Sequence, residues 1–64
     1  MMIDVIEKYR RAEGLTLAEL AQKARISPAT MSRRMADPAS FTVREVRNIF
    51  RALKVPEEDR RVIW

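Results

Sequence analysis

Apolar residues recur every three to four positions along most of the chain, a spacing that places them on one face of an α-helix. No stretch alternates apolar and polar residues as a half-buried strand would. Gly14 and three prolines, at positions 28, 38 and 56, interrupt the pattern where helices can begin or end. The pattern therefore predicts an all-α domain of four short helices and a shorter final one.

Capping signals indicate where these helices begin. Thr16 followed by Glu19, and Thr42 followed by Glu45, each fit a capping box, in which side chain and backbone bond reciprocally. Ser27 is a further N-cap, directly ahead of a proline at the favoured first position. The predicted helices span about residues 4–13, 17–24, 27–36 and 42–53, and a last short helix runs from 56 to the end.

One core is expected, because the apolar residues of each helix share an arc of roughly 100–120°. Met31 and Met35 lie four residues apart and are assigned to this core, and Phe41 is expected to anchor the loop before the fourth helix. Trp64 is either a lid on the core or an anchor at an interface. The other expected core residues are Met2, Val5, Ile6, Tyr9, Ala12, Leu17, Leu20, Ala21, Ala24, Val43, Val46, Ile49, Phe50, Leu53, Val62 and Ile63.

Length and composition exclude several classes of protein. The 64 residues suffice for one domain, and without cysteine or histidine the chain has no disulfide and no thiolate or imidazole metal ligand. It has no glycine-rich phosphate loop and no nucleophile–base pair, so no enzyme activity, cofactor or small-molecule ligand is expected. No apolar run approaches the roughly 20 residues that span a membrane, and no signal peptide is evident. A cytoplasmic protein is expected.

Positive charge gathers in the middle of the chain. Residues 22–54 carry eight basic and two acidic side chains, a net charge of +6, whereas the whole chain carries +4. Ten of the thirteen basic residues are arginine, whose planar fork suits phosphates and guanine edges. This distribution favours a nucleic-acid partner; the alternative is a solvated basic surface that serves solubility.

The second and third predicted helices form a candidate binding unit. They are joined by a tight turn that contains the apolar Ile26, as in a helix-turn-helix motif. The outward face of the third helix carries Arg33 among small residues, which allows close approach to the floor of a groove. The helix starts at Thr16 and Thr42 offer backbone N–H groups to phosphates. The small outward residues are Ala29, Ser32 and Ala36.

The segment 15–33, LTLAELAQKARISPATMSR, resembles the lambda-repressor/Cro-like (Xre-type) helix-turn-helix family through the pattern L-T-x-x-E-L-A…I-S-x-x-T-x-S-R. The resemblance extends over about residues 3–63, and residues 32–38 look like small phage or prophage members. It implies a compact five-helix, lambda repressor-like domain that inserts its third helix into the major groove of double-stranded DNA. It also implies a transcriptional regulator, such as a repressor, and a homodimer on a palindromic site.

The same resemblance assigns contacts to individual residues. Arg33 is expected to bond guanine O6 and N7 in a bidentate manner. Arg34 is either a phosphate contact or a solvated side chain, and so is Arg44. The implied base contacts are Pro28, Ala29, Ser32 and Arg33; the implied phosphate contacts are Thr16, Leu17, Thr30, Phe41, Thr42, Val43 and Arg44. Arg47, Arg51 and Lys54 are expected to be solvated or to pair with Glu57, Glu58 and Asp59.

Four residues depart from the family pattern. Arg25 replaces the glycine of the turn, and a left-handed conformation there would strain it by roughly 1–2 kcal/mol. Met35 replaces an acidic residue that often pairs with an arginine, so Arg10 needs another partner, such as Glu19, or stays solvated. The other two departures are Leu17, at a usual glutamine, and Pro28, at a usual polar base contact.

Two other functions are compatible with the sequence. The first is a protein-interaction module on the same fold, antitoxin-like or polymerase-contacting, that uses Trp64 and the last two helices. The second is an engineered DNA binder on this scaffold, which the unusual Leu17, Arg25 and Pro28 permit.

Overall fold

The computed structural model describes residues 1–61, which are all-helical as predicted. The predicted count of five helices is wrong: four α-helices and two 3-10 helices form over these residues. Where the fifth helix was expected, the described residues form the 3-10 helix Glu57–Arg61, and the rest of the expected helix, residues 62–64, lies outside the described residues. The elements are α1 (Met2–Glu13), α2 (Leu17–Lys23), α3 (Pro28–Ala36), η1 (Pro38–Ser40), α4 (Val43–Leu53) and η2 (Glu57–Arg61).

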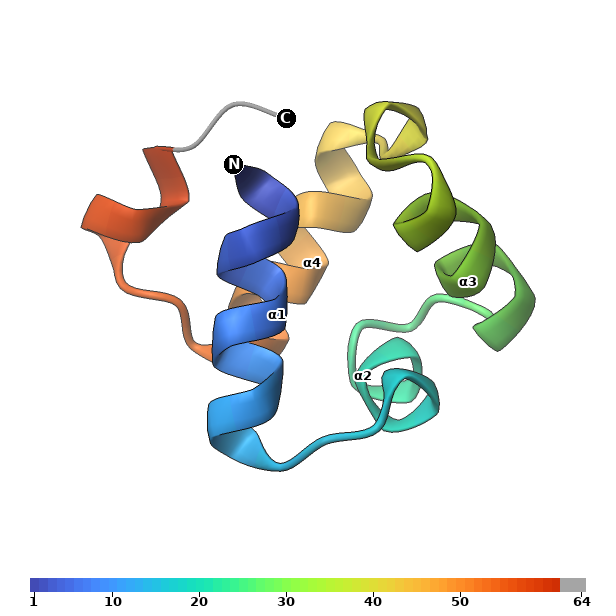
Figure 1. The fold of residues 1–64 in the computed structure, drawn as a ribbon, viewed down its shortest axis with the longest axis horizontal. Helices are drawn as coiled ribbons and strands as arrows, with labels where there is room; N and C mark the ends of the chain where they lie inside the picture. Colours follow the sequence, from blue (N-terminus) through green and yellow to red (C-terminus); the bar gives the residue numbers. More distant parts are fainter. Residues whose placement is uncertain (62–64) are drawn as a thin grey trace.

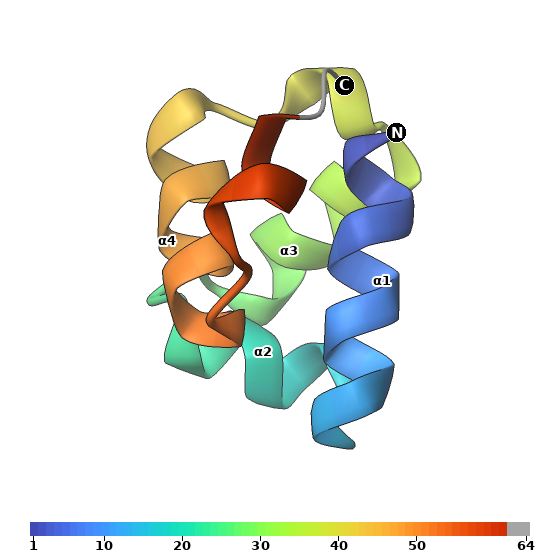
Figure 2. The same cartoon turned by 90° about the vertical axis from the view of Figure 1, so that its left-hand side faces the viewer.

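The α-helices pack in three contacting pairs. α1 packs against α4, while α2 contacts both α3 and α4 (Figure 1). η2 returns to the side of α1 and α4 that faces away from α3 (Figures 1 and 2). This arrangement leaves α3 at one side of the molecule, with only its inner face covered.

The turn between α2 and α3 is tight and strained as predicted. Arg25 has a φ angle of 58°, in the left-handed region that favours glycine. The next residue, Ile26, is buried, and its N–H donates to the carbonyl of Ala21 at 2.9 Å. Ser27 then caps α3, since its Oγ accepts from the N–H of Thr30 at 3.1 Å.

Both predicted capping boxes are present, and one of them also joins two helices. Thr16 and Glu19 bond reciprocally at the start of α2, as do Thr42 and Glu45 at the start of α4. The Oε1 atom of Glu45 accepts from the Thr42 N–H at 2.9 Å and from Nε of Arg34, on α3, at 3.1 Å. These bonds, above all the one from the Thr42 N–H, hold the pKa of Glu45 below its usual value.

The core follows the apolar faces with two exceptions. Ala12 is exposed because the buried residues of α1, Met2 and Ile6, lie in its first two turns, and Ala12 extends beyond them. Val43, expected inside, is 61% exposed at the first position of α4. Met35 is half-buried against the core, and residues 62–64, for which core or interface roles were predicted, lie outside the described residues. The buried core comprises Met2, Ile6, Leu20, Ala21, Ala24, Ile26, Met31, Phe41, Val46, Ile49, Phe50, Leu53 and Val55.

Polar side chains attach the C-terminal half of α1 to its surroundings. Arg10 has another partner, as one alternative expected, but the candidate Glu19 is not that partner: Arg10 donates to Oε2 of Glu7 at 2.6 Å and to the carbonyl of Leu15 at 2.8 Å, both of which lie nearer along the chain. The hydroxyl of Tyr9 donates to the carboxylate of Asp59, and this bond raises the pKa of Tyr9. η2 is thereby held against α1.

We expect Arg25→Gly to stabilise the domain. Glycine removes the Cβ clash at positive φ but adds freedom to the unfolded chain, so the expected net gain is about 0.5–1 kcal/mol. For a domain of this size that raises Tm by several degrees, which thermal unfolding measures. Arg25→Ala is the control, since it keeps the Cβ; equal Tm values for the two variants would contradict a strained turn.

The Glu45 carboxylate should make stability depend on pH. Its folded pKa is lowered, so its contribution is complete above the unfolded value of about 4.3 and is lost as the pH falls through the folded pKa. We expect Glu45→Gln to cost about 1 kcal/mol at pH 7 and to flatten the decline of unfolding free energy between roughly pH 5 and 3. Denaturant unfolding across this range measures both effects. Glu13→Gln, which removes an exposed carboxylate, is the control; identical slopes for both variants would contradict the assigned role.

Candidate nucleic-acid interface

The outward face of α3 has the shape that groove reading requires. Pro28, Ala29, Ser32 and Arg33 are all exposed on it, while Met31 faces the core. Apart from Arg33, these outward side chains are short. The helix can therefore approach a groove floor closely, with one long donor-bearing side chain in reach of base edges.

Hydrogen bonds link three polar side chains along α3. Oγ1 of Thr30 accepts from the Ser27 hydroxyl at 2.8 Å and from Nη2 of Arg33 at 3.3 Å. A guanidinium has five N–H donors, so this bond leaves the others of Arg33 available. Thr30 thus orients Arg33 on the exposed side of the helix.

The start of α4 presents backbone donors to solvent. The first N–H groups of a helix have no hydrogen-bond partner within the helix. In α4 these include the N–H groups of Val43 and Arg44, and the side chains of both residues are exposed. The backbone N–H and the side-chain hydroxyl of Thr42 are both hydrogen-bonded to Glu45, which keeps this end of α4 in helical geometry. An anion here would meet two N–H groups, the helix dipole and one guanidinium.

Several predicted phosphate contacts have other roles in the structure. The ring of Phe41 is only 4% exposed, and its N–H donates to the carbonyl of Pro38 at 3.2 Å, so this residue anchors the loop. Leu17 packs against the core and can offer only its backbone, next to the exposed cap Thr16. Nε of Arg34 is held by Glu45, which leaves the outer nitrogens for a phosphate.

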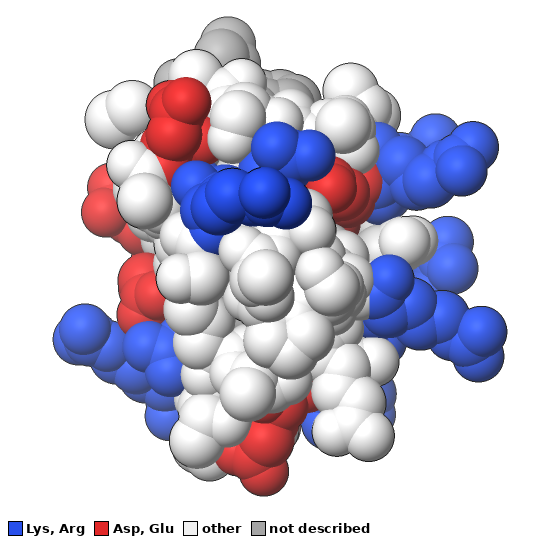
Figure 3. Space-filling view, turned by 90° about the vertical axis from the view of Figure 1, so that its right-hand side faces the viewer, with Lys and Arg blue, Asp and Glu red and all other residues white. Residues whose placement is uncertain are grey.

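Charge is unevenly distributed around α3. Figure 3 looks onto the side of the molecule that carries α3. A basic group crosses the upper middle of this face, the area below it is largely uncharged, and basic side chains project at the lower left and, in greater number, from the right-hand edge. Two adjoining hollows of about 190 and 310 Å³ lie along α4 and share Asn48 and Arg51. Their other lining residues are Lys23, Ala24, Arg25, Arg44, Arg47 and Ala52.

Sequence reasoning did not find these hollows. Arg47 and Arg51 were expected to be solvated or to pair with the acidic segment 57–59. Both are exposed and no ion pair joins them to that segment in the described part of the chain, which agrees with the solvated alternative. Lys23 and Asn48 gave no signal, because their proximity depends on the packing of α2 against α4. Only the helical spacing of the arginines at 44, 47 and 51 marked this face in the sequence.

Other kinds of site have no support within residues 1–61. They include no group of three or more His, Cys, Asp or Glu side chains that could hold a metal ion. None of their helices has the length and apolar character needed to cross a membrane.

Comparison with known proteins assigns the family. Residues 4–63 match the family described as "Helix-turn-helix domain", which covers the two helices and turn described above and nearly the whole chain. The comparisons with curated proteins and with solved structures give no match. The chain therefore belongs to the helix-turn-helix domain family, of the Xre/Cro-like type.

Proposed function

We propose that this domain is a sequence-specific double-stranded DNA-binding protein that regulates transcription as repressor/Cro-like proteins do. The observation that carries the proposal is the outward face of α3, where short side chains surround one arginine. Membership of the helix-turn-helix family supports DNA as the partner. In this proposal α3 lies in the major groove.

The proposed mechanism separates positioning from reading. Phosphates bind the N–H groups at the start of α4, the guanidinium of Arg44 and the hydroxyl of Thr30, and these contacts fix the register on the duplex. Arg33 then bonds O6 and N7 of a guanine, while Ala29 and Pro28 offer apolar contact to thymine methyl groups.

The proposal includes where in the cell the protein acts and in which oligomeric state. The protein acts without catalysis or a cofactor, in the cytoplasm of a bacterial or phage-infected cell, on DNA of the nucleoid. As a homodimer it would bind a palindromic site whose half-sites lie about 34–36 Å apart. A protein-interaction function based on Trp64 gains no support, because this residue lies outside the described residues.

The function is tested by selecting bound sequences from a random duplex library at about 150 mM salt, where nonspecific binding is weakened. We expect a motif with a guanine at a fixed position, and its symmetry will report a dimer or a monomer. A bound pool without a motif would reduce the function to electrostatic attraction. If the folded protein retains no DNA at all, the proposal is wrong.

Arg33→Ala should lose about 1–3 kcal/mol of binding free energy, concentrated at one base pair of the selected site. The matched variant is Arg44→Ala, which removes the same charge at a phosphate contact. It should weaken binding equally on all sequences and lower the salt slope by about 1. Titrations of both variants against the selected site and single-base changes measure this difference. A uniform loss for Arg33→Ala would assign Arg33 to a phosphate instead.

A further inference from the structure

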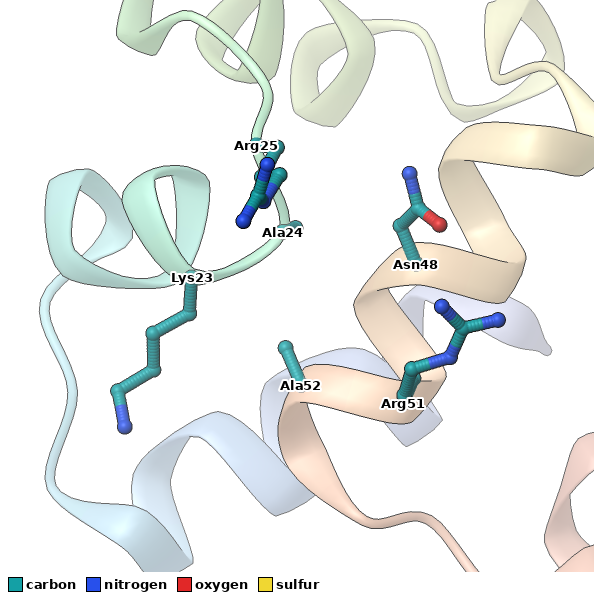
Figure 4. A pocket seen from close by; sticks show the side chains of 6 residues that line it. All are labelled: Lys23, Ala24, Arg25, Asn48, Arg51 and Ala52. Atoms are coloured by element: carbon teal, nitrogen blue, oxygen red, sulfur yellow. The ribbon is translucent and has the colours of Figure 1, made fainter.

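The two hollows along α4 form one basic trough. α4 lines its whole length with Arg44, Arg47 and Arg51, and the end of α2 and the turn form a second wall, with Lys23 and Arg25, only at the hollow that includes Ala52. In Figure 4, Arg25 faces Asn48 across the opening, and Arg51 lies on the α4 side. The residues that line the trough include no acidic side chain.

The arginines of the trough differ in their partners from most of the other arginines, although Arg61 of η2 has no hydrogen bond or ion pair within residues 1–61 either. Elsewhere, Arg10 is bonded to Glu7, Arg34 to Glu45, and Arg60 to the Val55 carbonyl at 2.7 Å. By contrast, none of the guanidinium groups of the trough has a hydrogen bond or an ion pair with any residue in the range 1–61. These are Arg25, Arg44, Arg47 and Arg51.

Unpaired like charges in one hollow repel each other, so the arrangement favours an anion that neutralises several of them. The arginines of α4 span about 10 Å along the helix axis, from Arg44 to Arg51. A single DNA strand presents a phosphate every 3.4 Å of duplex axis, so an extended strand can meet several of these groups. A small anion could not reach both ends.

The trough is continuous with the proposed DNA-binding face at both ends. At one end Arg44 belongs to the first turn of α4, where the phosphate contacts are proposed. At the other end Arg25 lies two residues before Ser27, the cap of α3. A strand that leaves α3 therefore finds the trough directly beside it.

We propose that the trough holds a further stretch of the sugar–phosphate backbone of the duplex that α3 reads. Arg25, Arg47 and Arg51 then bind phosphates that the helix-start contacts do not reach, and they extend the footprint without reading bases. This inference rests on the proposed function. The conformation of Arg25 adds support, because the turn would be less strained with glycine, whereas the arginine is one of the basic residues that line the trough.

The double variant Arg47→Gln, Arg51→Gln tests the proposal. Its control is Lys8→Gln, Arg11→Gln, which removes the same charge from α1, outside the trough. Affinity for the selected duplex is measured from 50 to 300 mM salt. We expect the slope of log K against log salt to fall by about 0.9 for each arginine removed, so by nearly 2, with little change for the control. The preferred bases should stay the same, since backbone contacts carry no sequence information.

Phosphate ethylation interference identifies the contacts directly. Ethylation of one or two backbone positions should impair binding of the unmodified protein but not further impair the double variant. Arg25→Gly provides a second measurement: it should raise Tm and still weaken DNA binding, which loss of folding could not produce.

The outcomes separate this inference from the proposed function. Equal salt slopes for the trough and control variants, with the unmodified protein still selecting its motif, would overturn the trough as a DNA site alone. If the trough variant keeps its salt slope but loses binding to poly-glutamate, the trough is a site for acidic protein segments, and the inference is wrong. If the unmodified protein binds no duplex, both proposals fail together.

Discussion

The position of α3 depends on one tight turn. Arg25 adopts a left-handed conformation, and this reversal lets Ile26 enter the core and bond the Ala21 carbonyl. Because the turn is so short, α2 contacts α3 and α4 at the same time. The inner face of α3 then packs through Met31, and its opposite face stays open. The left-handed conformation of Arg25 thus determines which face of α3 a ligand can meet.

The carboxylate of Glu45 gives this arrangement a second constraint. One oxygen holds the Thr42 N–H at the start of α4 and Nε of Arg34 on α3, so the two elements proposed to contact the same duplex are joined by it. The bond to Glu45 also engages Nε of Arg34, a residue that was predicted as a phosphate contact. The charge of +6 over residues 22–54 is therefore not uniform: some arginines hold the fold together, and others remain open to a ligand.

Local signals predicted much of this fold. The caps Thr16, Ser27 and Thr42 depend on short-range chemistry that can be read from neighbouring residues, whereas the left-handed conformation of Arg25 was anticipated only from the family resemblance, in which a glycine stands at this turn. Periodicity defines the inner face of a helix but not how far along it the neighbouring helix extends. For this reason Val43 of α4 and Ala12 of α1 were wrongly assigned to the core.

Longer-range features could not be predicted in this way. One of the two partners of Arg10 is the carbonyl of Leu15, whose position depends on the path of the α1–α2 loop. The trough requires Lys23 and Asn48 to be neighbours, and only the packing of α2 on α4 brings them together. The outward residues of α3 were predicted as base contacts from the family resemblance, and the structure exposes them without testing that role.

The division among the arginines bears on how this small domain balances stability against binding. An arginine that is already paired must give up its partner, or share it, before it binds a phosphate, and that loss reduces its contribution to affinity. Arg47 and Arg51 have no such partner among the described residues, so a phosphate would gain their full attraction. In the free domain, repulsion among the arginines of α4 and strain at Arg25 both lower the free energy of unfolding. The thirteen apolar residues buried within residues 1–61 must offset both, and this limits how many unpaired cations the domain can carry.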